Sequence, residues 1–204
     1  MKNELIIIGC GGHARSIADV YLSDHFGGTI TFKDQNAKIN ETLFGFPIFK
    51  DLVSDKSKER IIIGLGDNEI RKNKFLSIPK ERLINVISSK SYISPHLNQI
   101  GIGVFIGNFC HIGPMVSIGN NSIINTGSII EHEVKIGSNC HIAPNVTISG
   151  RTTIGDQVFI GVGSTIIDKL SVCDQVIIGA GSVVVSNITI PGTYIGCPAK
   201  LVVK

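Results

Sequence analysis

The 204-residue sequence contains no tryptophan, and only 6% of its residues are aromatic. Charged residues make up 17%, and the net charge is only +3. Because the basic residues are dispersed, the sequence shows no sign of nucleic-acid binding. Disorder is excluded because 43% of the residues are hydrophobic. Few aromatics together with 23 glycines favour a fold built from thin, regular layers.

Long apolar runs are also missing. No stretch reaches the roughly 18 apolar residues of a membrane span, and the run at residues 5–8 is too short for a signal peptide. The five cysteines are odd in number and lack paired spacing, so we expect no disulfide framework and a reducing, cytoplasmic location. Adjacent Cys-His pairs at 110–111 and 140–141 lack zinc-ligand spacing, so we expect no metal.

The first part of the chain alternates between strand and helix patterns. Strands are predicted at residues 5–8, 29–32, 60–64 and 83–87, and helices at 14–22 and 68–75. This alternation predicts a small parallel sheet with helices packed against it, a Rossmann-like α/β domain over residues 1–90.

From residue 100 the sequence follows a different period. Every sixth position from Ile100 to Ile190 is Ile or Val, and Gly often follows directly. A period of six fits neither a helix nor a flat strand and indicates hexapeptide β-helix repeats over residues 91–204. Three hexads form one triangular coil, so residues 100–189 predict five coils with the Ile side chains stacked inside. A passive rod or an ice-binding solenoid is the alternative without catalysis.

One hexad carries an unusual polar sequence. Glu131-His132-Glu133 replaces the small corner residues of other coils. Neighbouring carboxylates raise the proton affinity of an imidazole and fix its tautomer, which suits a general base. The alternative is a solvated surface histidine with incidental acidic neighbours.

Two further histidines share one position of the hexad, His111 and His141. They are thirty residues apart, which places them on different faces of an 18-residue coil. His141 follows His132 by half a coil, so the two would meet only between adjacent chains. One of the pair His111 and His141 is expected to be structural. No cysteine has the neighbours of a nucleophile.

A glycine-rich turn follows the first strand, reading Gly9-Cys10-Gly11-Gly12-His13 before a helix. Its amides suit a phosphate or diphosphate, and Asp34 stands where a ribose-binding acid would follow the second strand. Position 14 is Ala rather than the last Gly of GxGxxG, and the short domain favours a mononucleotide over a redox dinucleotide. The alternative is a tight turn without a ligand.

Four segments together resemble a known family: GCGGHAR at 9–15, GDNEIRKN at 66–73, SIIEHEVKIGSNCHIAPN at 128–145 and IGCPAKLV at 195–202. They resemble the bacterial hexapeptide-repeat sugar acyltransferases, in particular the nucleotide-sugar N-acetyltransferases of the bacillosamine pathway and the related sialic acid O-acetyltransferases. The resemblance implies a left-handed β-helix and a homotrimer with active sites between neighbouring chains.

The resemblance also implies roles for individual residues. His132 would be the catalytic base and Glu133 the residue that increases its basicity. Acetyl-CoA, the expected co-substrate, would contact His141, Gly161, Val162, Gly179 and Ala180. The UDP part of the acceptor would contact Gly12, His13, Asp34 and Gly66. The Asp-Asp pair of the family reads Asp34-Gln35 here.

The expected activity is direct acetyl transfer from acetyl-CoA to a UDP-linked amino sugar of the 4-amino-4,6-dideoxy type. An O-acetyltransferase acting on sialic acid or a related surface sugar is the alternative. A sugar-nucleotide-binding protein without catalysis is a third hypothesis, and it predicts no CoA binding. Neither nucleic acid nor membrane is expected as a partner.

Overall fold

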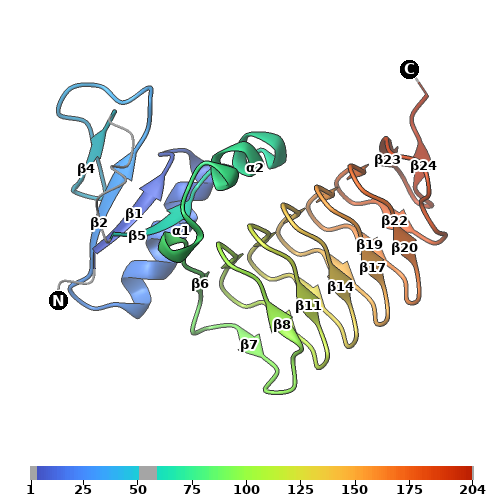
Figure 1. The fold of residues 1–204 in the computed structure, drawn as a ribbon. Coiled ribbons are helices and arrows are strands. Elements are labelled where there is room, and N and C mark those ends of the chain that lie inside the picture. Colours follow the sequence, from blue (N-terminus) through green and yellow to red (C-terminus); the bar gives the residue numbers. More distant parts are fainter. Residues whose placement is uncertain (1–3, 51–58, 204) are drawn as a thin grey trace.

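The computed structural model describes residues 4–50 and 59–203, which form an α/β part followed by a three-sided solenoid (Figure 1). The coils of the solenoid stack side by side in chain order, from the α/β part to the C-terminal end (Figure 1). This arrangement confirms the predicted fold class, a Rossmann-like domain joined to a parallel β-helix.

A five-stranded sheet forms the centre of the α/β part. Its order is β3-β4-β2-β1-β5, and all neighbours are parallel except β3 and β4. The strands are β1 (Glu4–Ile8), β2 (Thr29–Lys33), β3 (Thr42–Leu43), β4 (Phe46–Phe49) and β5 (Arg60–Ile63). The predicted strands at 5–8, 29–32 and 60–64 are confirmed. The hairpin of β3 and β4 was not predicted, because its two strands are too short to show a period.

Two helices pack against this sheet, α1 (Gly12–Asp24) and α2 (Asn68–Leu76), and a short 3-10 helix, η1 (Lys80–Arg82), follows. The apolar stripe of α1, including Ile17, Ala18 and Tyr21, is buried as its spacing predicts. The two helices begin differently. Asp67 caps α2 by accepting a hydrogen bond from the Ile70 amide, whereas no side chain caps α1.

The prediction of one last strand at residues 83–87 in the α/β sheet is wrong. Leu83 forms only an isolated bridge to Ile61, whereas β6 (Val86–Ile87) pairs with β9 (Phe105–Ile106) of the solenoid. The segment changes partners because its short apolar run lies where the two hydrophobic cores adjoin. The solenoid ladder therefore begins at residue 86.

Three sheets form the faces of the solenoid, and all their strand pairs are parallel except β23 with β24. Face 1 contains β6, β9, β12 (Ile123–Ile124), β15 (His141–Ile142), β18 (Phe159–Ile160), β21 (Ile177–Ile178), β23 (Thr193–Ile195) and β24 (Lys200–Leu201). Face 2 contains β7 (Tyr92–Ile93), β10 (His111–Ile112), β13 (Ile129–Ile130), β16 (Thr147–Ile148), β19 (Thr165–Ile166) and β22 (Val183–Val184). Face 3 contains β8 (Gln99–Ile100), β11 (Ser117–Ile118), β14 (Lys135–Ile136), β17 (Thr153–Ile154) and β20 (Ser171–Val172).

The register between coils confirms the 18-residue repeat. Ile124 pairs with Ile142, and Ile142 pairs with Ile160, so side chains 18 residues apart stack directly on one another. A second inward row, two residues before each Ile or Val of the first, was not predicted. It consists of small residues such as Val134, Cys140 and Ser164, which are fully buried. Alternating large and small rows fill the narrow triangular interior.

Two different constraints act at the corners. Every sixth position from 103 to 181 has a φ between 56° and 71°, although most of these residues are not glycine. The glycines directly after the Ile row do not have such positive φ values. They are required because a side chain would not fit between successive coils. A Cβ on Gly119 would lie 2.5 Å from the carbonyl carbon of Gly137 in the next coil. These glycines therefore serve close coil stacking rather than turn conformation.

The six-residue period ends before the last predicted repeat. Ile190 was expected to point inward, but it is 59% exposed, and Ile188 is buried in its place. Ile188 bridges to Val172, a separation of 16 rather than 18 residues (188 − 172 = 16). The last corner is two residues shorter, so the inward position moves back by the same amount.

Candidate active site

His132 and Glu133 occupy the corner between face 2 and face 3. The Nδ1 atom of His132 lies 2.9 Å from the Oε2 atom of Glu133, and both side chains are nearly half exposed. A carboxylate only accepts hydrogen bonds, so Nδ1 carries the proton, and Nε2 of the neutral ring keeps its lone pair. The pair therefore presents a base to the surface with its tautomer fixed.

The backbone of this corner holds the pair in place. Glu133 has a φ of 61°, and its amide donates to the Pro114 carbonyl in the preceding coil over 2.9 Å. In the following coil, the Arg151 amide donates to the carbonyl of His132, also over 2.9 Å. Because both neighbouring coils bind this corner, the position of His132 is set by the rigid ladder.

An interdomain cavity of about 850 Å³ lies between α2 and face 1 of the solenoid. Its walls include Gly66 and Asn73 from the α/β part and His141, Gln157 and Phe159 from the solenoid. A Cβ on Gly66 would meet no protein atom within 4 Å, so this glycine leaves open space rather than avoiding a clash. The predicted substrate residue Gly66 and the predicted cofactor residue His141 thus line the same cavity.

The imidazole of His141 is fixed on face 1. Its Nδ1 atom lies 3.1 Å from the Gly66 carbonyl oxygen, and its ring packs edge-on against Phe159 with centroids 5.2 Å apart. Burial is the main cause that lowers the pKa of His141 to about 4; the Gly66 hydrogen bond partly opposes this shift, and the charge of Arg71 contributes to it. The ring is therefore neutral at physiological pH.

His13 lies beside this cavity in the first turn of α1. Its ring packs edge-on against Phe105 at 5.1 Å and lies 6.2 Å from the ring of His141. Both ring nitrogens are buried, and neither has a hydrogen-bond partner among the residues that the structure describes. Burial lowers the pKa of His13 to about 3, with His141 and Arg71 acting in the same direction. Such orphaned nitrogens usually have a functional reason.

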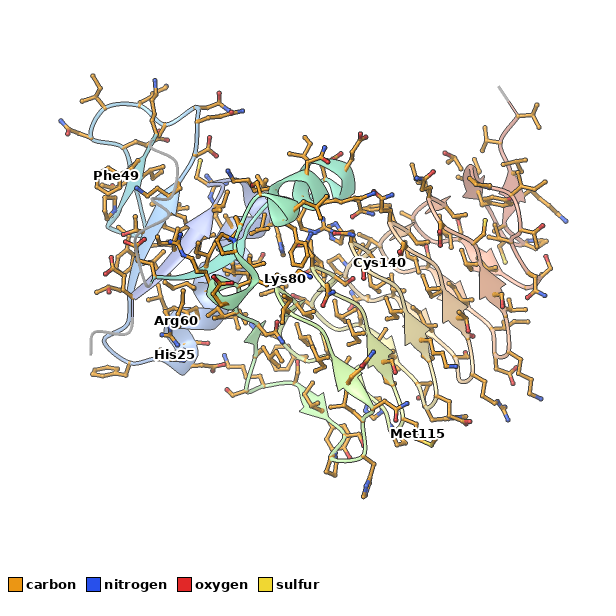
Figure 2. The ribbon with its side chains drawn as sticks, viewed as in Figure 1. His25, Phe49, Arg60, Lys80, Met115 and Cys140 are labelled. Atoms are coloured by element: carbon orange, nitrogen blue, oxygen red, sulfur yellow. The ribbon has the colours of Figure 1, made fainter. Side chains whose placement is uncertain are left out.

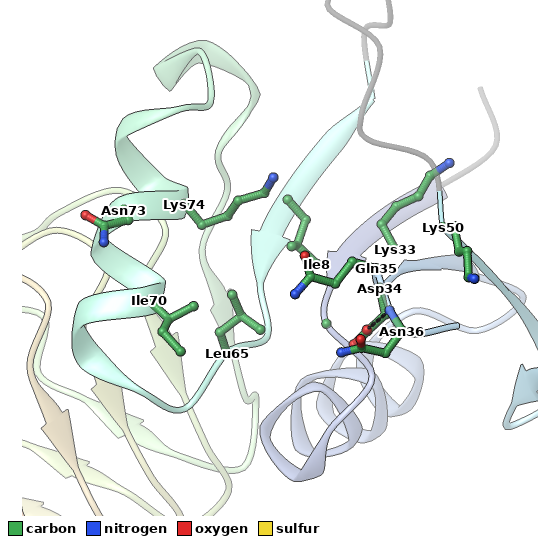
Figure 3. A pocket seen from close by; sticks show the side chains of 11 residues that line it. Ile8, Lys33, Asp34, Gln35, Asn36, Lys50, Leu65, Ile70, Asn73 and Lys74 are labelled. Carbon is green, nitrogen blue, oxygen red and sulfur yellow. Dashed lines mark hydrogen bonds between the residues drawn. The ribbon is translucent and has the colours of Figure 1, made fainter. Parts of the chain in front are cut away.

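A second cavity, the N-terminal cavity, lies at the carboxyl end of the α/β sheet and has a volume of about 540 Å³. Figure 3 shows its two walls, Leu65, Ile70, Asn73 and Lys74 on one side and the segment from Lys33 to Asn36 with Lys50 on the other. Asn73 lines both cavities, so they are adjacent. The predicted substrate residue Asp34 is part of this wall.

Asp34 also fixes the glycine-rich turn. Its Oδ2 atom accepts from the Cys10 amide at 3.1 Å and from the Cys10 thiol at 3.2 Å, and its Oδ1 atom accepts from the Asn36 amide. Burial and Asp34 together raise the pKa of Cys10 to about 11, so its thiol is a poor nucleophile. Gly12 is exposed at the uncapped start of α1, where an added Cβ would meet no atom within 4 Å.

The four other predicted cofactor residues lie together at the corner between face 1 and face 2. Val162 and Ala180 are exposed and occupy equivalent positions in successive coils. Gly161 and Gly179 lie beside them, and a Cβ on Gly161 would come within 2.5 Å of the Ala180 nitrogen. These residues therefore form a continuous edge near the face that carries His141, and they line neither of the two cavities.

Within one chain, His132 and the interdomain cavity lie at different corners. Helix α2 packs at the corner between face 3 and face 1, where Asn68 Nδ2 donates to the carbonyls of Gln157 and Val158. In Figure 2, Cys140 marks the edge beside α2, and Met115, one coil before Glu133, marks the opposite edge. The separation predicted for His132 and His141 on one chain is thus observed.

Sequence reasoning missed Arg71 and Asn68, which join the two parts of the molecule. Arg71 is 1% exposed and donates to backbone carbonyls of both parts. A buried arginine on a short polar helix has no distinctive pattern in a single sequence. Its membership of the GDNEIRKN segment was the only available signal.

Over residues 4–50 and 59–203, no cluster of three or more His, Cys, Asp or Glu is suited to hold a metal ion. In the same ranges, no helix is both long and apolar enough to cross a membrane. Cys110 and Cys140 belong to the small inward row, and burial raises the pKa of Cys140 to about 12. These two thiols therefore pack the interior.

Comparison with protein families matches both parts of the chain. Residues 4–78 match the PglD N-terminal domain. Residues 115–150 match the bacterial transferase hexapeptide, and residues 151–186 match the hexapeptide repeat of succinyl-transferase. An uncharacterized protein of Acanthamoeba polyphaga mimivirus is 34% identical over 121 residues, which are 58% of this chain but 24% of that protein. The chain thus spans about a quarter of the length of this curated relative.

Solved structures resemble the chain over nearly its whole length. A point mutant of GDP-perosamine N-acetyl transferase from Caulobacter crescentus, in complex with CoA and GDP-perosamine, has a TM-score of 0.91 and 28% identity, covering 98% of this chain and 97% of that one. The acetyltransferase domain of PglB from Neisseria gonorrhoeae, in complex with acetyl coenzyme A, has a TM-score of 0.91 and 26% identity, covering 99% and 100%. The chain therefore combines a PglD N-terminal domain with the hexapeptide repeats of bacterial transferases, and this combination gives its enzyme class as an acyltransferase.

Proposed function

We propose that this protein transfers an acetyl group from acetyl-CoA to the amine of a nucleotide-linked amino sugar, with His132 as the general base. The His132–Glu133 pair carries this proposal, because it presents an unprotonated Nε2 at a rigid, exposed corner. The structural relatives that bind CoA, acetyl coenzyme A and GDP-perosamine support the choice of donor and acceptor class.

The N-terminal cavity suits the nucleotide part of the acceptor. Lys33, Lys50 and Lys74 line it, which favours a ligand with negative charge. No side chain caps the start of α1. The first amides of a helix lack intrahelical partners, so an uncapped helix start is the usual arrangement for binding a phosphate or diphosphate. The sugar would then extend past Asn73 toward Gly66 and His141, because the two cavities adjoin there.

A second protomer completes the site in this proposal. His132 lies at the corner away from α2, so the acceptor cavity of one chain lies far around the solenoid from its own base. We infer a homotrimer in which the His132 corner of one chain faces the interdomain cavity of its neighbour. Sedimentation of the purified protein tests this assembly, and a monomer with full activity would contradict it.

The chemical steps follow from these positions. The amine of the sugar attacks the thioester carbonyl, and Nε2 of His132 takes its proton. Glu133 stabilises the imidazolium that forms. The tetrahedral intermediate then expels the CoA thiolate, which takes the proton back from His132. No covalent enzyme intermediate is required, because the thioester is already activated and both substrates are held together.

Substitution of His132 tests the role of the base. We expect His132→Ala to lower kcat by about 10²–10⁴-fold, the usual contribution of a general base. Removal of the imidazole should leave the fold unchanged, since the side chain is nearly half exposed. Near-wild-type turnover by His132→Ala would contradict this role.

The acceptor itself is tested with a thiol-release assay. We propose a UDP-linked sugar of the 4-amino-4,6-dideoxy type, and the assay compares it with the GDP-linked sugar and with sialic acid. Thiol release with only the GDP-linked sugar would overturn the choice of UDP while leaving the N-acetyltransferase activity in place. Release with only sialic acid would instead establish the O-acetyltransferase alternative. Calorimetry with CoA distinguishes both acetyltransferase hypotheses from a binding protein without catalysis, because only the acetyltransferases are expected to bind CoA.

A further inference from the structure

The hydrogen bond between His141 and Gly66 determines which nitrogen of His141 carries the proton. The partner of Nδ1 is a backbone carbonyl at 3.1 Å, and a carbonyl accepts but does not donate. Nδ1 must therefore be the protonated nitrogen. A neutral imidazole has one N–H group, so Nε2 of His141 is a hydrogen-bond acceptor. The low pKa of His141, about 4, keeps the ring in this neutral form.

The Gly66 carbonyl is in turn held by Arg71. The guanidinium donates from Nη1 to the carbonyls of Leu65 and Gly66 at 3.2 and 3.0 Å. Its remaining groups donate to the solenoid and to α2, with bonds to the carbonyls of Asn121, Asn139 and Cys140 and to the side chain of Asn68. Arg71 therefore fixes the loop that carries Gly66 relative to the strand that carries His141.

The ring of His141 is restrained from both sides along face 1. His141 pairs in register with Ile123 in the preceding coil and with Phe159 in the following coil. In the described part of the chain, no group hydrogen-bonds Nε2, and His141 lines the interdomain cavity. The acceptor nitrogen thus remains available to a molecule bound in that cavity.

We propose that Nε2 of His141 accepts a hydrogen bond from an N–H or O–H group of a bound substrate. Arg71 is the positioning residue: it holds the Gly66 carbonyl against Nδ1, and so keeps Nδ1 as the donor and Nε2 as the acceptor. The proposal rests on the proposed function and adds to it the kind of contact that His141 makes with a substrate. A nitrogen that accepts cannot stabilise the oxyanion of the thioester, so that role belongs to another donor. The donor group comes from an amide of the pantetheine arm or from the amine or a hydroxyl of the sugar.

Nitrogen NMR of the ¹⁵N-histidine-labelled full-length protein tests the tautomer directly. We expect a protonated Nδ1 and an unprotonated Nε2 for His141 at neutral pH. CoA alone and the UDP-linked amino sugar alone are then added, and the one that supplies the donor should shift the Nε2 resonance. An Nε2–H tautomer, or no shift with either addition, would overturn the proposal. Neither the tautomer nor the shift of the Nε2 resonance requires turnover. A failure of this proposal can therefore be distinguished from a failure of the proposed acetyl transfer.

Variants of Arg71 and His141 add a functional readout. We expect Arg71→Lys to raise the KM of the substrate that shifts Nε2 roughly tenfold, the usual effect of losing one hydrogen bond, with a smaller change in kcat. The His141 tautomer should become mixed at the same time. Arg82→Lys is the matched control, because Arg82 is also buried but bonds to Glu59 away from the cavities. An unchanged tautomer and KM in folded Arg71→Lys would contradict the positioning role.

Two substitutions of His141 remain informative if Arg71→Lys does not fold. Asparagine places an amide near the Nδ1 position only, whereas glutamine reaches the Nε2 position with an oxygen that accepts. We therefore expect His141→Gln to retain more substrate affinity than His141→Asn. Equal loss in both folded variants would contradict an acceptor at Nε2.

Discussion

Gly150 lies so close to His132 that a Cβ atom on it would come within 2.5 Å of both Cε1 and Nε2 of the imidazole. The glycine is in the coil that follows His132, so the ring of the base rests on the backbone of its neighbour. Gly150 is buried and does not have a positive φ, so its role is to leave space for the ring. The two residues therefore form one unit of the candidate site.

Gly150→Ala is expected to displace the base without unfolding the solenoid. The added methyl group pushes the imidazole from its position beside Glu133, and a displacement of about 1 Å costs up to about 10²-fold in rate. The half-exposed ring moves toward solvent, so the melting temperature should change little. Steady-state kinetics and thermal melting check this together. Unchanged kcat in the folded variant would show that the ring does not act from this position.

His13 is expected to make stability depend on pH. Its pKa is about 3 in the folded protein and about 6.5 when exposed, so between these values the unfolded chain binds more protons. Stability is thus fully present above about pH 6.5 and falls as the pH is lowered. The loss attributable to His13 at pH 5 is about 2 kcal/mol. Urea unfolding at pH 7 and pH 5 measures it.

His13→Leu supplies the matched variant for this measurement. It removes both unpartnered nitrogens while filling a similar volume, so stability at pH 7 should be equal or slightly higher. The difference between pH 7 and pH 5 should become smaller than in the wild type. His141 also has a lowered pKa, so part of the difference will remain. An unchanged difference would mean that His13 is not the neutral, buried group described above.

The inward ladder predicts a large loss of stability at one isoleucine of β13 and a small loss at the adjacent one. Ile130 is fully buried between coils, whereas Ile129 points outward and is 39% exposed. Ile130→Ala should lower the free energy of unfolding by about 2–5 kcal/mol, because it leaves a cavity in a close-packed column. Ile129→Ala should cost about 1 kcal/mol or less. Similar losses in urea unfolding would contradict the assignment of inward and outward rows.

Some parts of the fold could be predicted from the sequence because they depend on local repetition. The period of six placed Ile124, Ile142 and Ile160 in one stacked column, since each coil repeats the same local geometry. Where the repeat ends, the prediction failed. Ile190 keeps the period in the sequence but is exposed, because the length of the preceding corner decides which residue turns inward.

The candidate site could be predicted from the sequence where its functional residues lie in one short segment. His132 and Glu133 are adjacent in the chain, and their contact follows from the corner that they share. The bond between His141 and Gly66 spans 75 residues, and no single-sequence pattern predicts it. Arg71 likewise bonds Cys140 across 69 residues.

The sequence alone determined the solenoid, its inward Ile column and the acid-flanked His132, because residues near one another in the chain specify each of them. Only the tertiary structure decided that α2 packs on a corner of the solenoid and that Arg71 links the Gly66 loop to the strand of His141. These relationships depend on how two separate cores pack together. The physical reason is that such contacts depend on the shape and hydrogen-bonding groups of surfaces built from residues that are far apart in the chain.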